Sequence, residues 1–454
     1  MALLFGTDGI RGIAGQYPLD RDTIYRTGRC LTEHLRSLHP RPHIIIARDT
    51  RRSGPWIESL LLQAIHDAGG TEETCGVLST PAVSFLTSLK GVQAGVMISA
   101  SHNPFRDNGI KVFSSAGVKF TNAVEEELEK AILSCSAVAP VDVTEDQAFA
   151  ANPVFASERD NRELYIRHLM QVIPAAFSLR GMRLVVDCAH GSQSAIAPDF
   201  LSMLGAEVHP IHCEPDGCNI NHHAGALHPE RLQDEVVRMN AHIGIAFDGD
   251  ADRAMFVDSG GTVRDGDYAL YLLARHLQWD DAPRVVVGTV MSNLGLEVAL
   301  QELGFQFTRA AVGDRYVLEE MLRTGAVLGG EQSGHVIMSR FAPTGDGLLT
   351  ALKVLEILVA QQKDLAALCM PVKRFPQVLL NVPVAEKAPM DDIPGLRAAE
   401  AECRQALGPR SRILLRYSGT EKLARVMVEG EDESLVRNAA DRLASILKTT
   451  QNGV

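Results

Sequence analysis

The chain is 454 residues long, and 46% of its residues are hydrophobic while 22% are charged. That composition is ordinary for a soluble globular protein, and the length is too great for a single hydrophobic core. The formal net charge of -12 argues against nucleic acid or an anionic membrane surface as the main partner. An anionic ligand would therefore need a local basic site set against the overall charge.

The sequence also argues against membrane insertion and export. No apolar run approaches the roughly 18 residues of a spanning helix. The first residues, MALLFGTDGIRG, lack the charged segment and the long apolar stretch of a signal peptide. The eight cysteines contain no CxxC pair, which is typical of reduced thiols. We therefore expect a cytoplasmic protein.

The N-terminal part of the chain predicts alternating strands and helices. A glycine-punctuated loop, FGTDGIRG, places Thr7, Asp8 and Arg11 close together. The elements expected after it are a helix at about 21–37, a strand at 43–47 and helices at 55–69 and 125–133. Between the last two helices, the apolar run Val96-Met97-Ile98 predicts a buried strand. A polar connection is expected from about 136 to 156.

The strand at 96–98 ends in a segment rich in reactive side chains, Ser99-Ala100-Ser101-His102-Asn103-Pro104. In an open α/β sheet this edge is where ligands bind. Asn108-Gly109 predicts a tight turn, and Lys111 follows it. A hydroxyl nucleophile, an imidazole and a cation this close together suit group transfer. The alternative is an ordinary polar loop whose Ser and Asn side chains cap backbone groups.

Two further parts of the chain repeat the order of apolar strand, polar loop and helix. The first has a helix at about 158–173 and strands at 184–187 and 243–247. The second begins after a hairpin-like turn at Asp258-Ser259-Gly260-Gly261 and has strands at 284–290 and 327–335. This recurrence predicts three related α/β domains.

Histidine and cysteine cluster in one segment, at His209, His212, Cys213, Cys218, His222 and His223. Cys213 and Cys218 are five residues apart, and the spacings fit no common zinc pattern. Zinc is therefore the less favoured alternative, and we interpret the segment as a strand end followed by a turn at Pro215-Asp216-Gly217.

The last part of the chain, from about residue 372, predicts the order strand, helix, strand, strand, helix, which is typical of a small α+β domain. The fold class is therefore α/β, with three similar mixed α/β domains and a smaller α+β C-terminal domain. We expect the domains to span 1–152, 153–256, 257–370 and 371–450.

Asp248, Asp250 and Asp252 follow the strand at 243–247 at every second position. If extended geometry persists, all three carboxylates point the same way and repel one another unless a cation lies between them. Hard oxygen ligands suit Mg²⁺. The alternatives are a solvated acidic turn or a calcium loop, but Ser259 stands where an EF-hand has its twelfth-position Glu.

Two more loops carry polar side chains beside glycine. Gly330-Glu331-Gln332-Ser333-Gly334-His335 is suited to hydrogen-bonding sugar hydroxyls or an amine. Arg416-Tyr417-Ser418-Gly419-Thr420-Glu421, with Arg425 beyond, is suited to binding phosphate. Taken alone, each is equally consistent with an ordinary surface turn.

Eight segments together resemble, in the same order, those of the α-D-phosphohexomutases. They are FGTDGIRG, SASHNP (followed by DNGIK), DGDADR, VGDRY, GEQSGH, TGDGLLTAL, RYSGTE and RVMVEG. The resemblance covers nearly the whole chain and implies four domains arranged around a central cleft. It also implies that Ser101 carries a phosphoryl group and passes it to and from a sugar phosphate.

The resemblance implies a role for each matching residue. Mg²⁺ would be held by Ser101, Asp248, Asp250 and Asp252, and charge at the reacting group would be stabilised by Arg11 and Arg253. The candidates for proton transfer are Lys111, His102 and, less favoured, His335. The sugar would be bound by Glu331, Ser333 and His335, and the second phosphate by Arg416, Ser418, Gly419, Thr420 and Arg425.

Gln332 resembles the residue of family members that act on glucosamine phosphate. The implied reaction interconverts glucosamine 6-phosphate and glucosamine 1-phosphate through a phosphoserine enzyme and a bisphosphorylated sugar, toward UDP-N-acetylglucosamine. The expected partner is this small molecule, and the expected assembly is a monomer or homodimer.

Two alternatives stay open, a phosphomannomutase/phosphoglucomutase and a non-catalytic paralogue that binds sugar phosphates. The positions that depart from the family pattern are His190, Ala251, Ala311, Tyr417 and Lys422.

Overall fold

The computed structural model describes residues 4–6, 8–139, 144–151, 156–384, 386–417 and 422–451. Its contacts divide the chain into two compact units. One unit comprises Met1–Val290 with Thr308–Cys369, and the other comprises Met291–Phe307 with Met370–Val454. The units do not test the predicted domain boundaries at residues 152, 256 and 370, which stay predictions.

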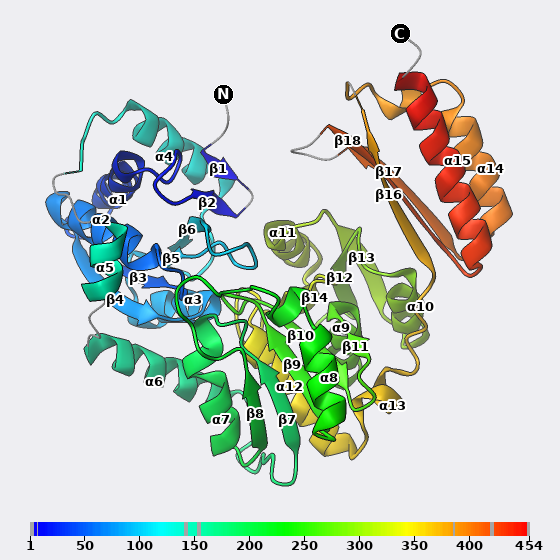
Figure 1. The fold of residues 1–454 in the computed structure, drawn as a ribbon, viewed down its shortest axis with the longest axis horizontal. Helices are drawn as coiled ribbons and strands as arrows, with labels where there is room; N and C mark the ends of the chain where they lie inside the picture. The colour runs from blue at the N-terminus through cyan, green and yellow to red at the C-terminus, as the bar shows by residue number, and fades with distance from the viewer. Residues whose placement is uncertain are drawn as a thin grey trace. The chain divides into compact units, whose positions relative to one another are not determined.

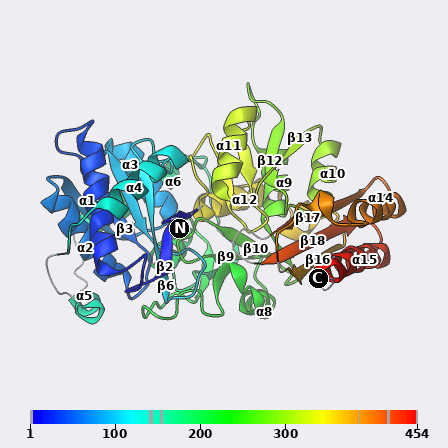
Figure 2. The same ribbon diagram turned by 90° about the horizontal axis from the view of Figure 1, so that it is seen from above.

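The first unit begins with a six-stranded sheet in the order β1-β2-β6-β5-β3-β4. Its strands are β1 Phe5–Gly6, β2 Gly9–Ile13, β3 His43–Arg48, β4 Thr71–Val77, β5 Ala94–Ile98 and β6 Asp107–Ser114. The helices are α1 Arg21–Arg36, α2 Gly54–Asp67, α3 Thr80–Lys90, α4 Asn122–Ser134, α5 Glu145–Ala151 and α6 Ala156–Gln171. The predicted strands and helices of this region are confirmed (Figures 1 and 2).

Strand β5 shows why the serine loop lies where it does. All five of its residues are buried, because helices cover both faces of the sheet. Val96 and Ile98 belong to the hydrophobic core that α1 and α2 share. On the other face Gly95 lies against α3, where an added Cβ would come within 2.0 Å of Thr87 Oγ1. Packing on both faces therefore fixes the position of β5, and with it the position at which the serine loop begins.

One local expectation for this region was wrong. Asn108 and Gly109 lie inside β6, paired with Gly12 and Arg11, and form no turn. Gly109 is needed for close approach, since a Cβ there would lie 2.6 Å from the Ser99 carbonyl oxygen. Two others were incomplete. The described residues of FGTDGIRG, which exclude Thr7, contain the paired strands β1 and β2, and the expected proximity of Asp8 and Arg11 is confirmed by their ion pair. The polar connection before residue 156 contains α5.

Two more sheets complete the first unit. One has the order β11-β10-β9-β7-β8, and the other β13-β12-β14-β15. The strands are β7 Arg183–Asp187, β8 Glu207–Ile211, β9 Ile243–Phe247, β10 Ala254–Asp258, β11 Val263–Arg264, β12 Val285–Thr289, β13 Gln306–Ala310, β14 Leu328–Gly330 and β15 Val336–Met338. The α-helices of this part are α7 Ala197–Met203, α8 Glu230–Arg238, α9 Gly266–His276, α11 Asp314–Thr324, α12 Gly347–Gln361 and α13 Leu365–Cys369.

The predicted hairpin at 258–261 is confirmed by the antiparallel pair β10 and β11. The strand end in the histidine-rich segment is confirmed by β8, and Asp216 Oδ1 accepts hydrogen bonds from the N–H groups of Cys218 and Asn219 in the turn that follows. All eight cysteines are free thiols. Among the described residues, only the three aspartates 248, 250 and 252 group as metal ligands, so the structure gives no support to zinc.

The second unit contains a three-stranded antiparallel sheet in the order β16-β18-β17. Its elements are α10 Leu294–Glu302, β16 Gln377–Pro383, α14 Leu396–Leu407, β17 Ser411–Tyr417, β18 Leu423–Gly430 and α15 Glu433–Gln451. Val426 and Val428 of β18 form one core with Leu396 of α14 and Leu443 of α15. The predicted order of strand, helix, strand, strand, helix is confirmed.

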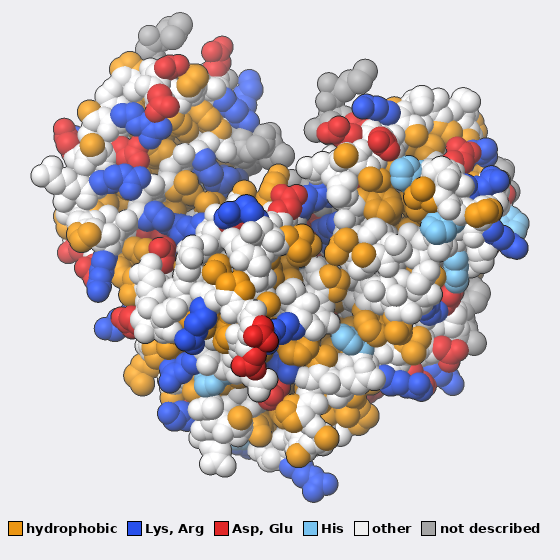
Figure 3. Space-filling model, turned by 180° about the vertical axis from the view of Figure 1, so that it is seen from behind, with side chains coloured by type: hydrophobic (Ala, Val, Ile, Leu, Met, Phe, Trp, Pro, Cys, Tyr) orange, Lys and Arg blue, Asp and Glu red, His pale blue; other side chains and the backbone are white. Residues whose placement is uncertain are grey.

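Within the described residues, no helix combines the length and the apolar character needed to cross a membrane. On the face drawn in Figure 3, acidic and basic side chains are interspersed.

One buried arginine holds the serine loop against the sheet. Arg51 is fully buried, and its Nε donates to Asp49 Oδ2 at 2.9 Å. Its two terminal nitrogens donate to four carbonyl oxygens of the loop, those of Ser101, Asn103, Pro104 and Asp107. Since the guanidinium has a rigid set of five donors, it can satisfy these buried acceptors together.

We predict that Arg51→Met lowers the free energy of unfolding by about 3–5 kcal/mol, because it leaves the buried Asp49 carboxylate without its paired cation. Urea denaturation followed by circular dichroism checks this. The matched control is Arg52→Met, whose side chain is 37% exposed and pairs with the exposed Asp146; that change should cost less than about 1 kcal/mol. Equal losses in the two variants would contradict the role given to Arg51.

Candidate active site

Ser101 stands in the loop after β5 with a backbone that few residues adopt. Its φ is 52°, in the left-handed region, and its side chain is buried. The Ser101 N–H donates to Ser99 Oγ at 2.9 Å, and Ser99 Oγ donates to Asp49 Oδ2 at 2.6 Å. A strained residue held by such a network is typical of functional positions.

The Ser101 hydroxyl faces the predicted metal loop. Its Oγ donates to Asp248 Oδ2 at 2.6 Å, and His102 Nδ1 lies 3.2 Å from the same Oγ. The structure therefore brings together the serine, the imidazole and the acidic segment that the sequence singled out.

The three aspartates converge through a turn, and the expectation of continued extended geometry was wrong. Ala251 has a φ of 56°, and the loop reverses there before β10. Even so, one ligand oxygen from each of the three carboxylates lies within 4.8 Å of the others. Gly249 lets the acidic loop pack closely against the serine loop, since a Cβ there would lie 2.7 Å from the Ser101 carbonyl oxygen.

The carboxylates have the free oxygens that a metal ion needs. Asp250 Oδ1 and Asp252 Oδ1 are buried and have no hydrogen-bond partner among the described residues. Burial and the neighbouring carboxylates of Asp252 and Asp250 raise the pKa of Asp248 well above its usual value. Buried acceptors and crowded like charges are both relieved by a bound cation, so the residues present fit a hard metal ion.

Cations surround this acidic centre. Lys111 is buried on β6, and its Nζ lies 2.8 Å from Asp250 Oδ2, 3.2 Å from Asp8 Oδ2 and 3.8 Å from Asp252 Oδ2. Burial alone would lower the pKa of Lys111, but these carboxylates raise it far above its usual value. Lys111 therefore stays an ammonium ion at neutral pH.

The two arginines retain unused donors. Arg253 Nε lies 3.9 Å from Asp248 Oδ2 and 3.7 Å from Asp252 Oδ1, beyond hydrogen-bond distance. Arg253 Nε and Arg11 Nε are both buried without a hydrogen-bond partner in the described part of the chain. Guanidinium groups in this state are suited to an anionic ligand with several oxygens.

The two histidines differ in environment. Burial, with the charges of Arg253 and Arg11, lowers the pKa of His102 to about 4, so its ring is neutral at pH 7. Burial would lower the pKa of His335 too, but the Asp252 carboxylate raises it. His335 Nδ1 lies 3.5 Å from Asp252 Oδ2, and its Nε2 accepts from the Gly345 N–H at 3.2 Å.

The GEQSGH loop joins the same unit. Arg253 and His335 form an isolated antiparallel bridge, which places the loop beside the metal segment. Glu331 Oε1 accepts from the Gly313 N–H at 2.9 Å, so this carboxylate also ties down the VGDRY segment. Gln332 Nε2 and Ser333 Oγ are buried with no partner among the residues described.

The predicted phosphate-binding residues belong to the second unit. Arg416 and Arg425 are cross-strand partners on β17 and β18. Burial and the charge of Arg425 lower the pKa of Arg416, as expected for two guanidinium groups held together. The other predicted members of this loop, Ser418, Gly419 and Thr420, lie outside the described residues. Tyr417, one of the departures from the family pattern, donates its hydroxyl to the Ala388 carbonyl at 2.6 Å.

Sequence reasoning missed several members of the site. Asp8 contacts Arg11, Lys111 and Lys119, and Lys119 Nζ also lies 2.5 Å from Asp314 Oδ2. From the sequence, Asp8 is named in its loop without a role, although an acidic residue near Arg11 could have indicated an ion pair at the site. Lys119 had none, since nothing in its own segment places it near residues 8 and 314.

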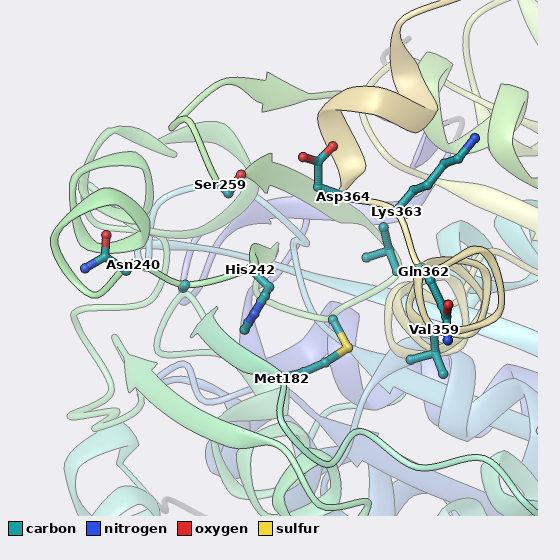
Figure 4. A pocket seen from close by; sticks show the side chains of 10 residues that line it. Met182, Asn240, His242, Ser259, Val359, Gln362, Lys363 and Asp364 are labelled. Carbon is teal, nitrogen blue, oxygen red and sulfur yellow. The ribbon is translucent and has the colours of Figure 1, made fainter.

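Cavities lie beside this site and away from it. One of about 360 Å³ is lined by His102, Asn103 and His222 among others. Another, of about 560 Å³, includes Met182, His242 and Lys363 (Figure 4). Because Met182 and His242 precede β7 and β9, this second cavity lies at the end of the strands opposite to Asp248. It contains none of the predicted site residues.

Models of one protein family match most of the chain. The match to phosphoglucomutase/phosphomannomutase covers alpha/beta/alpha domain I at residues 2–138, domain II at 163–261, domain III at 265–375 and the C-terminal domain at 379–446. The chain therefore belongs to the phosphoglucomutase/phosphomannomutase family, whose members are phosphohexomutases.

Individual proteins and structures are also similar to this chain over nearly its whole length. A phosphoglucosamine mutase of Solibacter usitatus is 44% identical over 98% of this chain and 98% of its own length. A phosphoglucosamine mutase of Moorella thermoacetica is 45% identical over 96% of this chain and 97% of its own. The crystal structure of a phosphoglucomutase/phosphomannomutase family protein from Burkholderia thailandensis has a TM-score of 0.79 at 25% identity, covering 100% of this chain and 98% of that one.

We predict that a divalent metal raises the melting temperature of the wild-type protein, because the carboxylate cluster that binds it exists only in the folded state. Asp248→Asn should weaken metal affinity by more than the about 10–100-fold typical of losing an outer-shell partner. Thermal melts across a Mg²⁺ titration measure both effects. Asp234→Asn is the control, since Asp234 is exposed on α8. The same metal-induced shift in Asp248→Asn and wild type would exclude this site.

Proposed function

We propose that the protein interconverts glucosamine 6-phosphate and glucosamine 1-phosphate, as an intramolecular phosphotransferase of the isomerase class. The observation that carries the proposal is the buried Ser101 hydroxyl, 2.6 Å from Asp248 Oδ2 in a carboxylate cluster with unpaired oxygens. The choice of sugar is supported by the relatives named phosphoglucosamine mutase, which are 44% and 45% identical over nearly the whole chain.

Ser101 is the proposed carrier of the phosphoryl group. In the first half-reaction the bond between phosphorus and Ser101 Oγ breaks, and a bond from phosphorus to the free hydroxyl oxygen of the sugar phosphate forms. The bisphosphorylated sugar then reorients, and its other phosphoryl group returns to Ser101 Oγ. Each half-reaction therefore exchanges one P–O bond for another, with no net hydrolysis.

The metal that best suits the site is Mg²⁺, held by Ser101 and by Asp248, Asp250 and Asp252. When bound, it would polarise the phosphoryl group and offset charge at the reacting oxygens. Arg11 and Arg253, whose Nε donors are unpaired among the described residues, would bind the phosphoryl oxygens.

In each half-reaction the attacking hydroxyl loses a proton and the leaving oxygen gains one, and Ser101 Oγ leaves in the first half-reaction and attacks in the second. Of the three candidates, His102 has a ring nitrogen within hydrogen-bond distance of Ser101 Oγ, at 3.2 Å. Lys111 Nζ is instead engaged by the carboxylates of Asp250 and Asp8, which suits it to hold charge in place. We therefore assign proton transfer at Ser101 Oγ to His102, which would take the proton when Oγ attacks and return it when Oγ leaves, and we assign an electrostatic role to Lys111.

The sugar and its second phosphate would be held by separate loops. Glu331 would pair with the substrate ammonium, and Ser333 and His335 would contact the ring; Ser333 Oγ is buried and has no partner in the described part of the chain. We propose the phosphate set as Arg416, Ser418, Gly419, Thr420 and Arg425. We also propose four domains, with boundaries at residues 152, 256 and 370.

We also infer a cytoplasmic location, because eight free thiols suit a reducing compartment. A monomer or homodimer is sufficient for the proposed chemistry, since the first unit supplies the serine, the metal ligands and the sugar loop.

We predict that Ser101→Ala abolishes the phosphoryl adduct seen by intact mass and lowers mutase turnover by about a thousand-fold or more, because the nucleophile is lost. Peptide mapping and a coupled assay of glucosamine 6-phosphate turnover with Mg²⁺ are the measurements. Ser115→Ala, at an exposed serine, is the control. Undiminished turnover in Ser101→Ala would exclude the phosphoserine mechanism.

We predict that Gln332→Met lowers kcat/KM for glucosamine 6-phosphate about ten-fold, because a buried amide that hydrogen-bonds the substrate is lost. Turnover of glucose and mannose phosphates should change less. The comparison of all three substrates, in wild type and variant, decides the point. A variant unchanged on glucosamine phosphate, with wild type preferring mannose or glucose phosphate, would favour a phosphomannomutase/phosphoglucomutase.

A further inference from the structure

Asp250, one of the three proposed metal ligands, is held by a residue that the proposed chemistry does not use. Thr80 is buried at the first position of α3, where Ser79 caps the helix. Its hydroxyl donates to Asp250 Oδ2 at 2.5 Å, and its N–H donates to the Asp250 carbonyl oxygen at 3.0 Å. Lys111 Nζ donates to the same Oδ2 at 2.8 Å. Two donors therefore occupy one oxygen of this carboxylate.

The other oxygen of Asp250 is left for a ligand. Oδ1 is buried and has no hydrogen-bond partner within the described residues, on a side chain that is itself fully buried. The two donors on Oδ2 thus orient the carboxylate so that Oδ1 remains available to a metal ion. A buried carboxylate oxygen without a donor is costly unless a cation approaches it.

Of the other two aspartates, only Asp252 shows the same division. Asp248 Oδ2 accepts from Ser101 Oγ at 2.6 Å, and Asp248 Oδ1 accepts from the Arg253 N–H at 3.3 Å. Asp252 Oδ2 faces His335 Nδ1 at 3.5 Å and Lys111 Nζ at 3.8 Å, while its Oδ1 has no hydrogen-bond partner among the described residues. Asp250 and Asp252 therefore each have one oxygen turned toward protein donors and one without a hydrogen bond among the described residues, which suits them to bind a metal through a single oxygen.

Single-oxygen binding discriminates between metal ions. Mg²⁺ is small, demands octahedral geometry and takes one oxygen from each carboxylate, with water completing its shell. Ca²⁺ is larger, takes more ligands and often binds both oxygens of a carboxylate. A carboxylate whose second oxygen is held by a hydroxyl and an ammonium cannot turn to offer both.

We propose that Thr80 determines metal selectivity, by holding Asp250 in a one-oxygen geometry that favours Mg²⁺ over Ca²⁺. Thr80 is a positioning residue, since it contacts the metal ligand and not the reacting atoms. This inference rests on the proposed metal role of the three aspartates and is independent of which sugar phosphate the protein uses.

The test measures Mg²⁺ and Ca²⁺ affinities of the full-length protein, by competition against Mn²⁺ followed by electron paramagnetic resonance. Thr80→Val removes the hydroxyl but keeps the shape of the side chain and the N–H bond to Asp250. We expect the preference for Mg²⁺ over Ca²⁺ to fall by about ten-fold, the scale of losing an outer-shell partner. Thr80→Ser, which keeps a hydroxyl, should restore most of the preference.

The outcomes separate selectivity from packing. Equal loss of affinity for both cations in Thr80→Val, or an unchanged ratio of the two, would overturn the proposal. If Thr80→Val does not fold, Thr80→Ala with the melting temperature measured beside the affinities takes its place, under the same criterion. A wild-type protein that shows the expected selectivity but no mutase turnover would contradict the proposed function and leave this inference standing.

Discussion

Three carboxylates that share a buried space are the constraint on which the rest of the site depends. Oxygens of Asp248, Asp250 and Asp252 lie within 4.8 Å of one another, an arrangement that is unfavourable without compensating charge. Lys111 supplies part of that charge from a different sheet, so the acidic loop after β9 and the strand β6 stabilise each other. Because Asp8 and Lys119 extend the same chain of ion pairs to Asp314, these ion pairs link four segments that are far apart in sequence.

The need to satisfy buried polar groups also explains how the serine loop is held in place. A loop that carries the proposed nucleophile at a φ of 52° needs its carbonyl groups satisfied, since buried backbone acceptors are costly to leave unpaired. Arg51 donates hydrogen bonds to these carbonyl oxygens, and Asn221 Nδ2 adds hydrogen bonds to those of Ser101 and Asn103. The nucleophile is thus positioned by groups that take no part in the chemistry. The oxygens and guanidinium nitrogens that lack hydrogen bonds among the described residues lie where the proposed function places a metal ion and a phosphoryl group.

Prediction from the sequence worked where the signal was local. The apolar runs of β5 and β9 marked two buried strands, and the residues directly after them include Ser101 and Asp248. Prediction was wrong where the outcome depended on a partner segment. Asn108-Gly109 has the composition of a turn, yet it pairs with Arg11 and Gly12 in a sheet. The acidic loop was expected to stay extended, but it turns at Ala251. Thr80 and Lys119 carried no signal, because their roles come from contacts with residues 250, 8 and 314.

The sequence by itself determined which chemical groups are present and at which strand ends they stand. Periodicity and apolar runs report burial, and motif order identifies the family, because both are properties of the chain read along its length. Only the tertiary structure decided that, in Asp250 and Asp252, one oxygen faces protein donors while the other has no hydrogen bond among the described residues. That choice depends on donors supplied by α3, β6 and the segment around His335, whose distances from Asp250 and Asp252 no linear pattern encodes. Hydrogen-bond direction between distant segments is set by packing, and packing exists only in the folded chain.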